Sequence, residues 1–229
     1  MMIDIHSHDT QLFPNLKKVL SIQLHPETDI LSLSNALPPE LLLSVGVHPW
    51  HASEWTSANM HKLLAMLQSS QITFIGEIGL DNVCGIPLSE QMNVFEIQLQ
   101  VADIKGIAVL IHNVGHQSEL LALKKKYKNI PAWIIHGFRG KATTAQQYLS
   151  SGFYLSFGFV HQREAIQICP IERLFLESDE AKAELAQLYE KVAQEKGLTF
   201  QELECNINRN FISLFGKEKG PHYCSPFCD

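Results

Sequence analysis

Eight short apolar runs constrain the fold of this chain more than any other feature. They are rich in β-branched or large apolar residues, and none alternates cleanly with polar residues. Strands that are apolar on both faces are typical of a parallel sheet covered by helices. Eight such strands in 229 residues predict an α/β fold, a compact TIM-type (β/α)8 barrel. The expected strands cover residues 2–5, 19–24, 41–47, 73–78, 107–111, 132–135, 153–157 and 173–176.

Helical patterns separate these runs. The clearest covers 88–105, in which Phe95, Leu99 and Ala102 recur at steps of three and four. Ser89 is a candidate N-cap for this helix, and Gly106 lies just past its end. The helical signal is thin between the first and third strands, so we expect abbreviated first βα units. The other expected helices cover 59–68, 117–126, 143–150, 181–196 and 200–214.

Side chains of the types that bind metal ions stand at the ends of these strands. His6 and His8 close the first strand in Asp4-Ile5-His6-Ser7-His8, and strand alternation sends both to the same side. An isolated His-x-His pair is a weak signal, but four more residues that can bind metal follow later strands in phase. The strand ends of a parallel barrel meet on one rim, where these groups would converge. The later residues are Glu77, His112, His136 and Asp179.

Such a ligand set predicts a metal-dependent hydrolase. A carboxylate can bridge two ions, and two ions roughly 3.5–4 Å apart could activate water and stabilise a phosphate ester. Histidines with carboxylates suit Zn²⁺ or Mn²⁺, whereas Mg²⁺ prefers a more oxygen-rich shell, so we expect two divalent ions of Mg, Mn or Zn. We expect Asp179 to accept the proton of the attacking water.

Two more rim residues have expected roles. Asp4 would accept the second N–H of a ligand histidine, and the alternative is a plain strand-end carboxylate. His48, in Gly46-Val47-His48-Pro49, would contact the substrate, and the alternative is that it pins the loop. The remaining histidines are expected on the surface or in loops: His25, His51, His61, His116 and His161.

Composition limits the other classes of function. The net charge of −6 and the lack of a wide basic surface argue against binding duplex DNA. The five cysteines are odd in number and scattered, which favours free thiols, and no apolar segment is long enough to span a bilayer. We therefore expect a cytoplasmic monomer with one domain, residues 1–216, and a flexible tail, residues 217–229.

In this order the motifs resemble those of the TatD family of metal-dependent hydrolases. Asp4-Ile5-His6-Ser7-His8 resembles the family's opening Asp-x-His-x-His, and Gly46-Val47-His48-Pro49 resembles its Gly-x-His-Pro turn. The further matches are Ile75-Gly76-Glu77-Ile78-Gly79-Leu80-Asp81, Gln91, Phe95, Gln98 and Ala102 in the following helix, Ile111-His112, His136-Gly137-Phe138-Arg139-Gly140, Leu176-Glu177-Ser178-Asp179, and Asn210 with Leu214-Phe215-Gly216.

The resemblance implies a dinuclear site in a barrel of the amidohydrolase-like superfamily. It implies that Asp179 and the two histidines of the first strand hold one ion. His112 and His136 would hold the other ion, and Glu77 would bridge the two. It also implies hydrolysis of phosphodiesters in DNA, which the strand-end residues alone do not indicate.

Two departures from the family pattern concern the substrate. Family members usually carry an arginine two residues beyond the fifth-strand histidine, where this chain has Val114. We expect Arg139, beside the sixth-strand ligand, to contact the phosphate in its place. Residues 180–182 are expected to enter a helix at once, whereas the family has a proline-containing loop there.

Three functions are compatible with this sequence. The leading one is a divalent-metal phosphodiesterase, a deoxyribonuclease acting on DNA ends or small nucleotide esters. The alternative is an amidohydrolase-type C–N or ester hydrolase that acts on a small molecule. The third is a metal-binding protein without activity, against which the complete ligand set argues. The PHP-type phosphoesterases share the opening motif, but the later motifs fit them less well.

Overall fold

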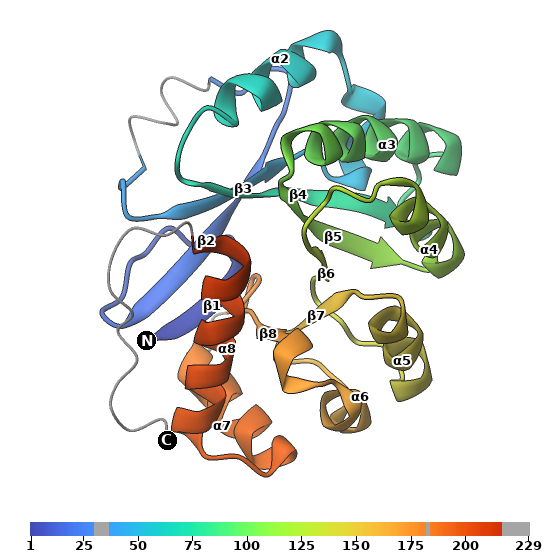
Figure 1. Cartoon of the computed structure of the whole chain (residues 1–229). Coiled ribbons are helices and arrows are strands. Elements are labelled where there is room, and N and C mark those ends of the chain that lie inside the picture. The colour runs from blue at the N-terminus through green and yellow to red at the C-terminus, as the bar shows by residue number, and fades with distance from the viewer. Residues whose placement is uncertain (30–36, 182–183, 217–229) are drawn as a thin grey trace.

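The computed structural model describes residues 1–29, 37–181 and 184–216. Its strands form a single parallel sheet in which each strand pairs with its neighbours in chain order. This is the predicted TIM-type barrel, and Figure 1 shows the strands at its centre with helices around them. The strands are β1 (Met2–Ser7), β2 (Leu16–Gln23), β3 (Leu42–Gly46), β4 (Ile72–Asp81), β5 (Ala108–Val114), β6 (Trp133–Ile135), β7 (Tyr154–Phe157) and β8 (Leu174–Leu176).

Helices follow the strands from β3 onwards. Residues 8–15, between β1 and β2, contain no helix, so the abbreviated first unit is confirmed there; between β2 and β3 the described residues contain none either, and residues 30–36 are not among them. None of the described helices is long and apolar enough to cross a membrane. The helical segments are η1 (Pro49–Glu54), α2 (Ser57–Met66), α3 (Leu88–Lys105), α4 (Gln117–Lys126), α5 (Ala142–Ser150), α6 (Arg163–Ile168), η2 (Ile171–Arg173), α7 (Leu185–Lys196) and α8 (Phe200–Phe215).

The barrel closes between its first and last strands. Ser7 at the end of β1 forms a parallel bridge with Asp179, three residues past β8. The amide of Asp179 donates to the His6 carbonyl at 3.0 Å, and the amide of His8 donates to the Asp179 carbonyl at 3.3 Å. Closure of the barrel therefore brings residues from the two ends of the sequence into one small area.

The expected elements match the structure except at several boundaries. Strands β4 and β5 each run three residues further than expected, so Asp81 and His112 lie inside strands. Helix α7 begins at Leu185 instead of 181, and Pro87 occupies the N-cap position of α3, so the assignment of Ser89 as its cap was wrong. The single-turn to two-turn segments η1, α6 and η2 were missed because they are too short to show a helical period.

Glycine ends α3 as expected, because Gly106 adopts a left-handed backbone with φ of 62°. Cys84 and Cys169 carry free thiols. The expected flexible tail, residues 217–229, lies outside the described residues, so the domain boundary at 216 stays a prediction.

The side chains of two glutamines in α3 form hydrogen bonds with the backbone just past β3 and at the end of β4. The Gln98 side chain is fully buried, and its Oε1 accepts the Val47 amide at 2.8 Å while its Nε2 donates to the Val47 carbonyl at 3.1 Å. Gln91 forms the same pair of bonds with the backbone of Asp81, at 2.8 and 2.9 Å. Each amide thus satisfies backbone groups where β3 and β4 leave the barrel.

Replacing Gln98 with alanine should lower the free energy of unfolding by about 2–4 kcal/mol, because two buried backbone groups lose their partners. Urea denaturation followed by circular dichroism measures this change. Gln100→Ala is the matched control, since Gln100 is exposed on the same helix. It should change stability by less than about 0.5 kcal/mol, and equal losses in both variants would contradict this role for Gln98.

Candidate metal centre

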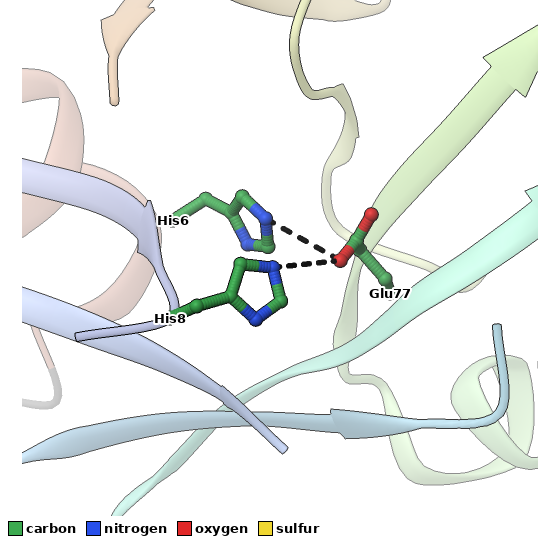
Figure 2. Close-up of side chains that lie close together, drawn as sticks. All are labelled: His6, His8 and Glu77. Atoms are coloured by element: carbon green, nitrogen blue, oxygen red, sulfur yellow. Dashed lines mark ion pairs between the residues drawn. The ribbon is translucent and has the colours of Figure 1, made fainter. Parts of the chain in front are cut away.

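The Glu77 carboxylate lies at the middle of the rim, with imidazoles on both sides. It extends from β4 and is 5% exposed. Figure 2 shows His6 and His8, which come from the end of β1, both facing one oxygen of this carboxylate. The remaining ligand-type residues lie around the same group, so the structure brings all six predicted side chains together.

One group of residues gathers near Oε2 of Glu77. The Nε2 atom of His6 lies 3.4 Å from this oxygen, and that of His8 lies 3.5 Å from it. The Oδ1 atom of Asp179 is 3.4 Å from His6 Nε2 and 3.7 Å from His8 Nε2. Two imidazole nitrogens and two carboxylate oxygens thus converge on one point.

A second group faces the other oxygen, Oε1. His136 Nε2 lies 2.7 Å from it, and His112 Nδ1 lies 3.6 Å from it. These two ring nitrogens are 3.3 Å apart. His48 Nε2 is also near, at 3.6 Å from the same oxygen. Glu77 therefore has a separate cluster of nitrogens at each oxygen, which is the geometry expected of a carboxylate that bridges two cations.

These donors fit a divalent ion on two grounds. Both ring nitrogens of His6 are buried without a hydrogen-bond partner, although buried polar atoms are normally paired. The separations of 3.4–3.7 Å around Oε2 are longer than good hydrogen bonds. They match the edge of about 3.3–3.6 Å of a tetrahedron with metal–ligand bonds of about 2.0–2.2 Å.

Carboxylates behind the second group fix the orientation of its rings. Asp81 Oδ2 accepts His112 Nε2–H at 2.9 Å, which leaves Nδ1 directed at Glu77. Glu177, which is fully buried, lies 3.4 Å from His136 Nδ1 and accepts the Gly137 amide at 2.6 Å. A carboxylate behind a ligand histidine fixes its tautomer and raises its basicity as a ligand.

Asp4 has a different partner from the one expected. Its two carboxylate oxygens accept bonds from the Ser178 amide at 3.0 Å and the Ser178 hydroxyl at 2.7 Å. Burial raises the pKa of Asp4 to about 6, against the opposing effect of these bonds. Asp4 therefore holds the segment that carries Asp179. The expectation that Asp4 accepts a hydrogen bond from a histidine ring is wrong, because its partner is Ser178.

Charge is distributed unevenly between the central groups. Burial favours the neutral form of Glu77, but His136 and His6 outweigh it and hold its pKa well below the usual range. Burial likewise disfavours a charged His136, yet Glu77 and Glu177 raise the pKa of this imidazole well above its ordinary value. The site thus stabilises positive charge next to Glu77, which a metal ion would supply.

The centre opens into a cavity of about 900 Å³. His48, Trp50 and Arg139 line it, as do Asp179 and Glu180. The exposed Arg139 is the one lysine or arginine among its described lining residues. Val114, at the position where the family arginine was expected, brings no charge to the wall.

Trp50 and Asp81 link this wall to the metal centre. The indole of Trp50 is 57% exposed, and its Nε1 donates to Asp81 Oδ2 at 2.8 Å, the oxygen that also binds His112. Hydrogen bonds from Trp50 and Val83 overcome the effect of burial and hold the pKa of Asp81 at about 2. Our sequence reasoning gave no role to Asp81, Glu177 or Trp50, although a carboxylate at the end of β4 was a visible signal.

Replacing Asp81 with asparagine should weaken the binding of a divalent ion at His112 by about 10–100-fold, as is typical of lost carboxylate–histidine contacts. Whichever way the new amide turns, it has one acceptor oxygen where Asp81 uses two. Zinc titration against a chromophoric chelator measures the affinity. Asp103→Asn, the same change on α3 outside the cavity lining, should leave zinc binding unchanged, and unaltered affinity in both variants would contradict the role of Asp81.

Comparison with known proteins identifies relatives across most of the chain. Residues 14–216 match the family model described as TatD related DNase. The 3'-5' ssDNA/RNA exonuclease TatD of Salmonella typhimurium is 29% identical over 166 residues, which are 68% of this chain and 64% of that protein. The protein of the same name from Klebsiella pneumoniae is 29% identical over 200 residues, 76% of each chain.

Solved structures share the fold. The TatD homologue YJJV from Escherichia coli superposes with a TM-score of 0.81 at 19% identity, covering 95% of this chain and 98% of that one. An amidohydrolase from Saccharomyces cerevisiae superposes with a TM-score of 0.71 at 15% identity, covering 87% of this chain and 88% of that one. With a family match over 14–216 and the predicted motifs in place, the chain belongs to the TatD related DNase family.

Proposed function

We propose that this protein is a divalent-metal-dependent phosphodiesterase that cleaves DNA ends or small nucleotide esters. The observation that carries the proposal is the Glu77 carboxylate with a cluster of imidazole nitrogens at each oxygen, opening into a 900 Å³ cavity. Its relatives are named 3'-5' ssDNA/RNA exonucleases, which supports a phosphodiester over the amide or other C–N bond of the alternative.

In this proposal, two divalent ions of Mg, Mn or Zn occupy the centre. Asp179 and the two β1 histidines would hold one ion, His112 and His136 would hold the other, and Glu77 would be shared between them. When bound, such ions supply an activated water at neutral pH and positive charge for the scissile phosphate. The carboxylates of Asp81 and Glu177, behind His112 and His136, favour ring orientations that suit this assignment.

Asp179 is the proposed proton acceptor. Its side chain is 29% exposed and faces the cavity, beside the Oε2 cluster. Burial would raise its pKa, but His6 and His136 lower it, so the group is ionised at neutral pH. An ionised carboxylate at this position can take the proton that water releases as it attacks phosphorus.

His48 is the proposed neutral donor to the substrate. Burial lowers the pKa of this imidazole to about 3, so the ring is uncharged at neutral pH. Its Nδ1 accepts the Trp50 amide at 3.2 Å, which leaves the proton on Nε2, near the metal cluster. This N–H can therefore donate to a phosphate oxygen, and Arg139 adds a positive charge elsewhere in the cavity lining. The monomeric state and the cytoplasmic location stay predictions.

Removing the metals should abolish activity. EDTA should stop the hydrolysis of bis-p-nitrophenyl phosphate, and added Mn²⁺ or Zn²⁺ should restore it. Glu77→Gln should lower kcat/KM by about 10³-fold even with excess metal, since the bridging charge is worth several kcal/mol. Glu90→Gln, an exposed charge on α3, is the matched control and should keep full activity. Hydrolysis that survives both EDTA and the loss of Glu77 would refute the mechanism.

Arg139→Ala should raise KM for a phosphodiester by about 10–100-fold, because a charge-assisted bond to phosphate is worth about 1.5–3 kcal/mol. Arg139→Lys should recover part of this loss, since lysine keeps the charge but not the bidentate contact. Initial rates on a single-stranded oligonucleotide measure both changes. A KM that is equal in the wild type and both variants would remove Arg139 from the substrate site.

A further inference from the structure

A second group of ligand-type side chains lies on the rim outside the Glu77 centre. His25 follows β2, and His51 and Glu54 belong to η1. One ligand atom from each of the three lies within 4.8 Å of the other two. The Glu77 centre uses none of them, and His51 also lines the cavity, so the group borders the same opening.

The two imidazoles of the group lie one at each oxygen of the Glu54 carboxylate. His51 Nδ1 lies 3.0 Å from Glu54 Oε1, and His25 Nδ1 lies 3.5 Å from Glu54 Oε2. The two imidazole rings are 4.6 Å apart and nearly perpendicular, at 81°. An ordinary hydrogen bond accounts for the first contact, but 3.5 Å is too long for a good one.

Backbone contacts hold the ligands in this arrangement before any ion arrives. The His25 amide donates to Thr28 Oγ1 at 2.9 Å, and the His25 carbonyl accepts from Lys62 Nζ at 3.2 Å. The His51 amide donates to the His48 carbonyl at 2.9 Å. Both segments are therefore fixed to the rim, and a bound ion would mainly have to order the side chains, which lowers the entropic cost of binding.

The donor set is that of a divalent metal site with open positions. Two imidazoles and one carboxylate are a common zinc ligand set, in which water or another ligand takes the fourth position. One ligand atom of each residue lies within 4.8 Å of the other two, compared with a tetrahedral edge of about 3.3 Å, so small side-chain rotations would bring all three onto one ion. The side chains are 32%, 35% and 46% exposed, so an ion and its remaining ligands have access from solvent.

We propose that His25, His51 and Glu54 form a third divalent-metal site, at the edge of the cavity and separate from the Glu77 centre. Zn²⁺ is the ion that this set favours. The site has a consequence for the cavity, where Arg139 is the one lysine or arginine among the described lining residues. A cation there would add positive charge to the cavity on the side of η1.

Metal stoichiometry tests the site without relying on activity. The purified protein is stripped with a chelator, equilibrated with buffered micromolar free Zn²⁺, and analysed for bound zinc per chain. His51→Ala and the isosteric Glu54→Gln should each bind one equivalent fewer than the wild type. His61→Ala, an exposed histidine on neighbouring α2, should match the wild type. Circular dichroism checks that each variant is folded.

The Glu77 centre is probed independently in the same experiment. Glu77→Gln should lose zinc from its own centre and keep the equivalent that Glu54→Gln loses, so the double variant should show both losses. Failure of the phosphodiesterase proposal leaves this result intact. If His51→Ala and Glu54→Gln bind as much zinc as the wild type, the third site is overturned.

Discussion

The bridge between Ser7 and Asp179 is the contact on which the site depends. It closes the barrel, and it also sets the relation between the β1 histidines and the carboxylate that follows β8. Asp179 adopts a left-handed backbone with φ of 53°, which is uncommon for a residue other than glycine. Two backbone hydrogen bonds to β1, and the hydrogen bonds that Ser178 donates to Asp4, hold Asp179 in this conformation. Strain at such a position is tolerated where the surroundings impose it.

Excess negative charge makes this arrangement favourable for bound cations. Glu77, Asp179, Asp81 and Glu177 lie within the centre or directly behind it, whereas its imidazoles are neutral unless they take up protons. Without metal, protonation of His136 offsets part of the charge, as its raised pKa indicates. Bound divalent ions would replace that proton, so metal binding and proton release are coupled at this centre.

The sequence predicted the barrel because its strands are apolar on both faces, and it predicted which side chains gather around Glu77 because they follow those strands in phase. It could not predict where β4 and β5 end, since residues 79–81 and 112–114 extend them through backbone pairing that apolar content does not report. That extension places the Asp81 carboxylate within hydrogen-bond distance of His112. The sequence also did not indicate that Ser178 is the partner of Asp4, because the two residues are 174 positions apart and only closure of the barrel brings them together.

The segment 48–54 connects the features of the rim. It supplies His48 to the cavity, Trp50 to Asp81, and His51 with Glu54 to the second group of ligands. One oxygen of Asp81 binds both Trp50 and His112, so a shift of this segment changes the orientation of a proposed metal ligand. Gln98 fixes the start of the segment through Val47, and Gln91 fixes Asp81. Helix α3 therefore helps to position the residues of the centre, although none of its own residues touches the Glu77 carboxylate in the described contacts.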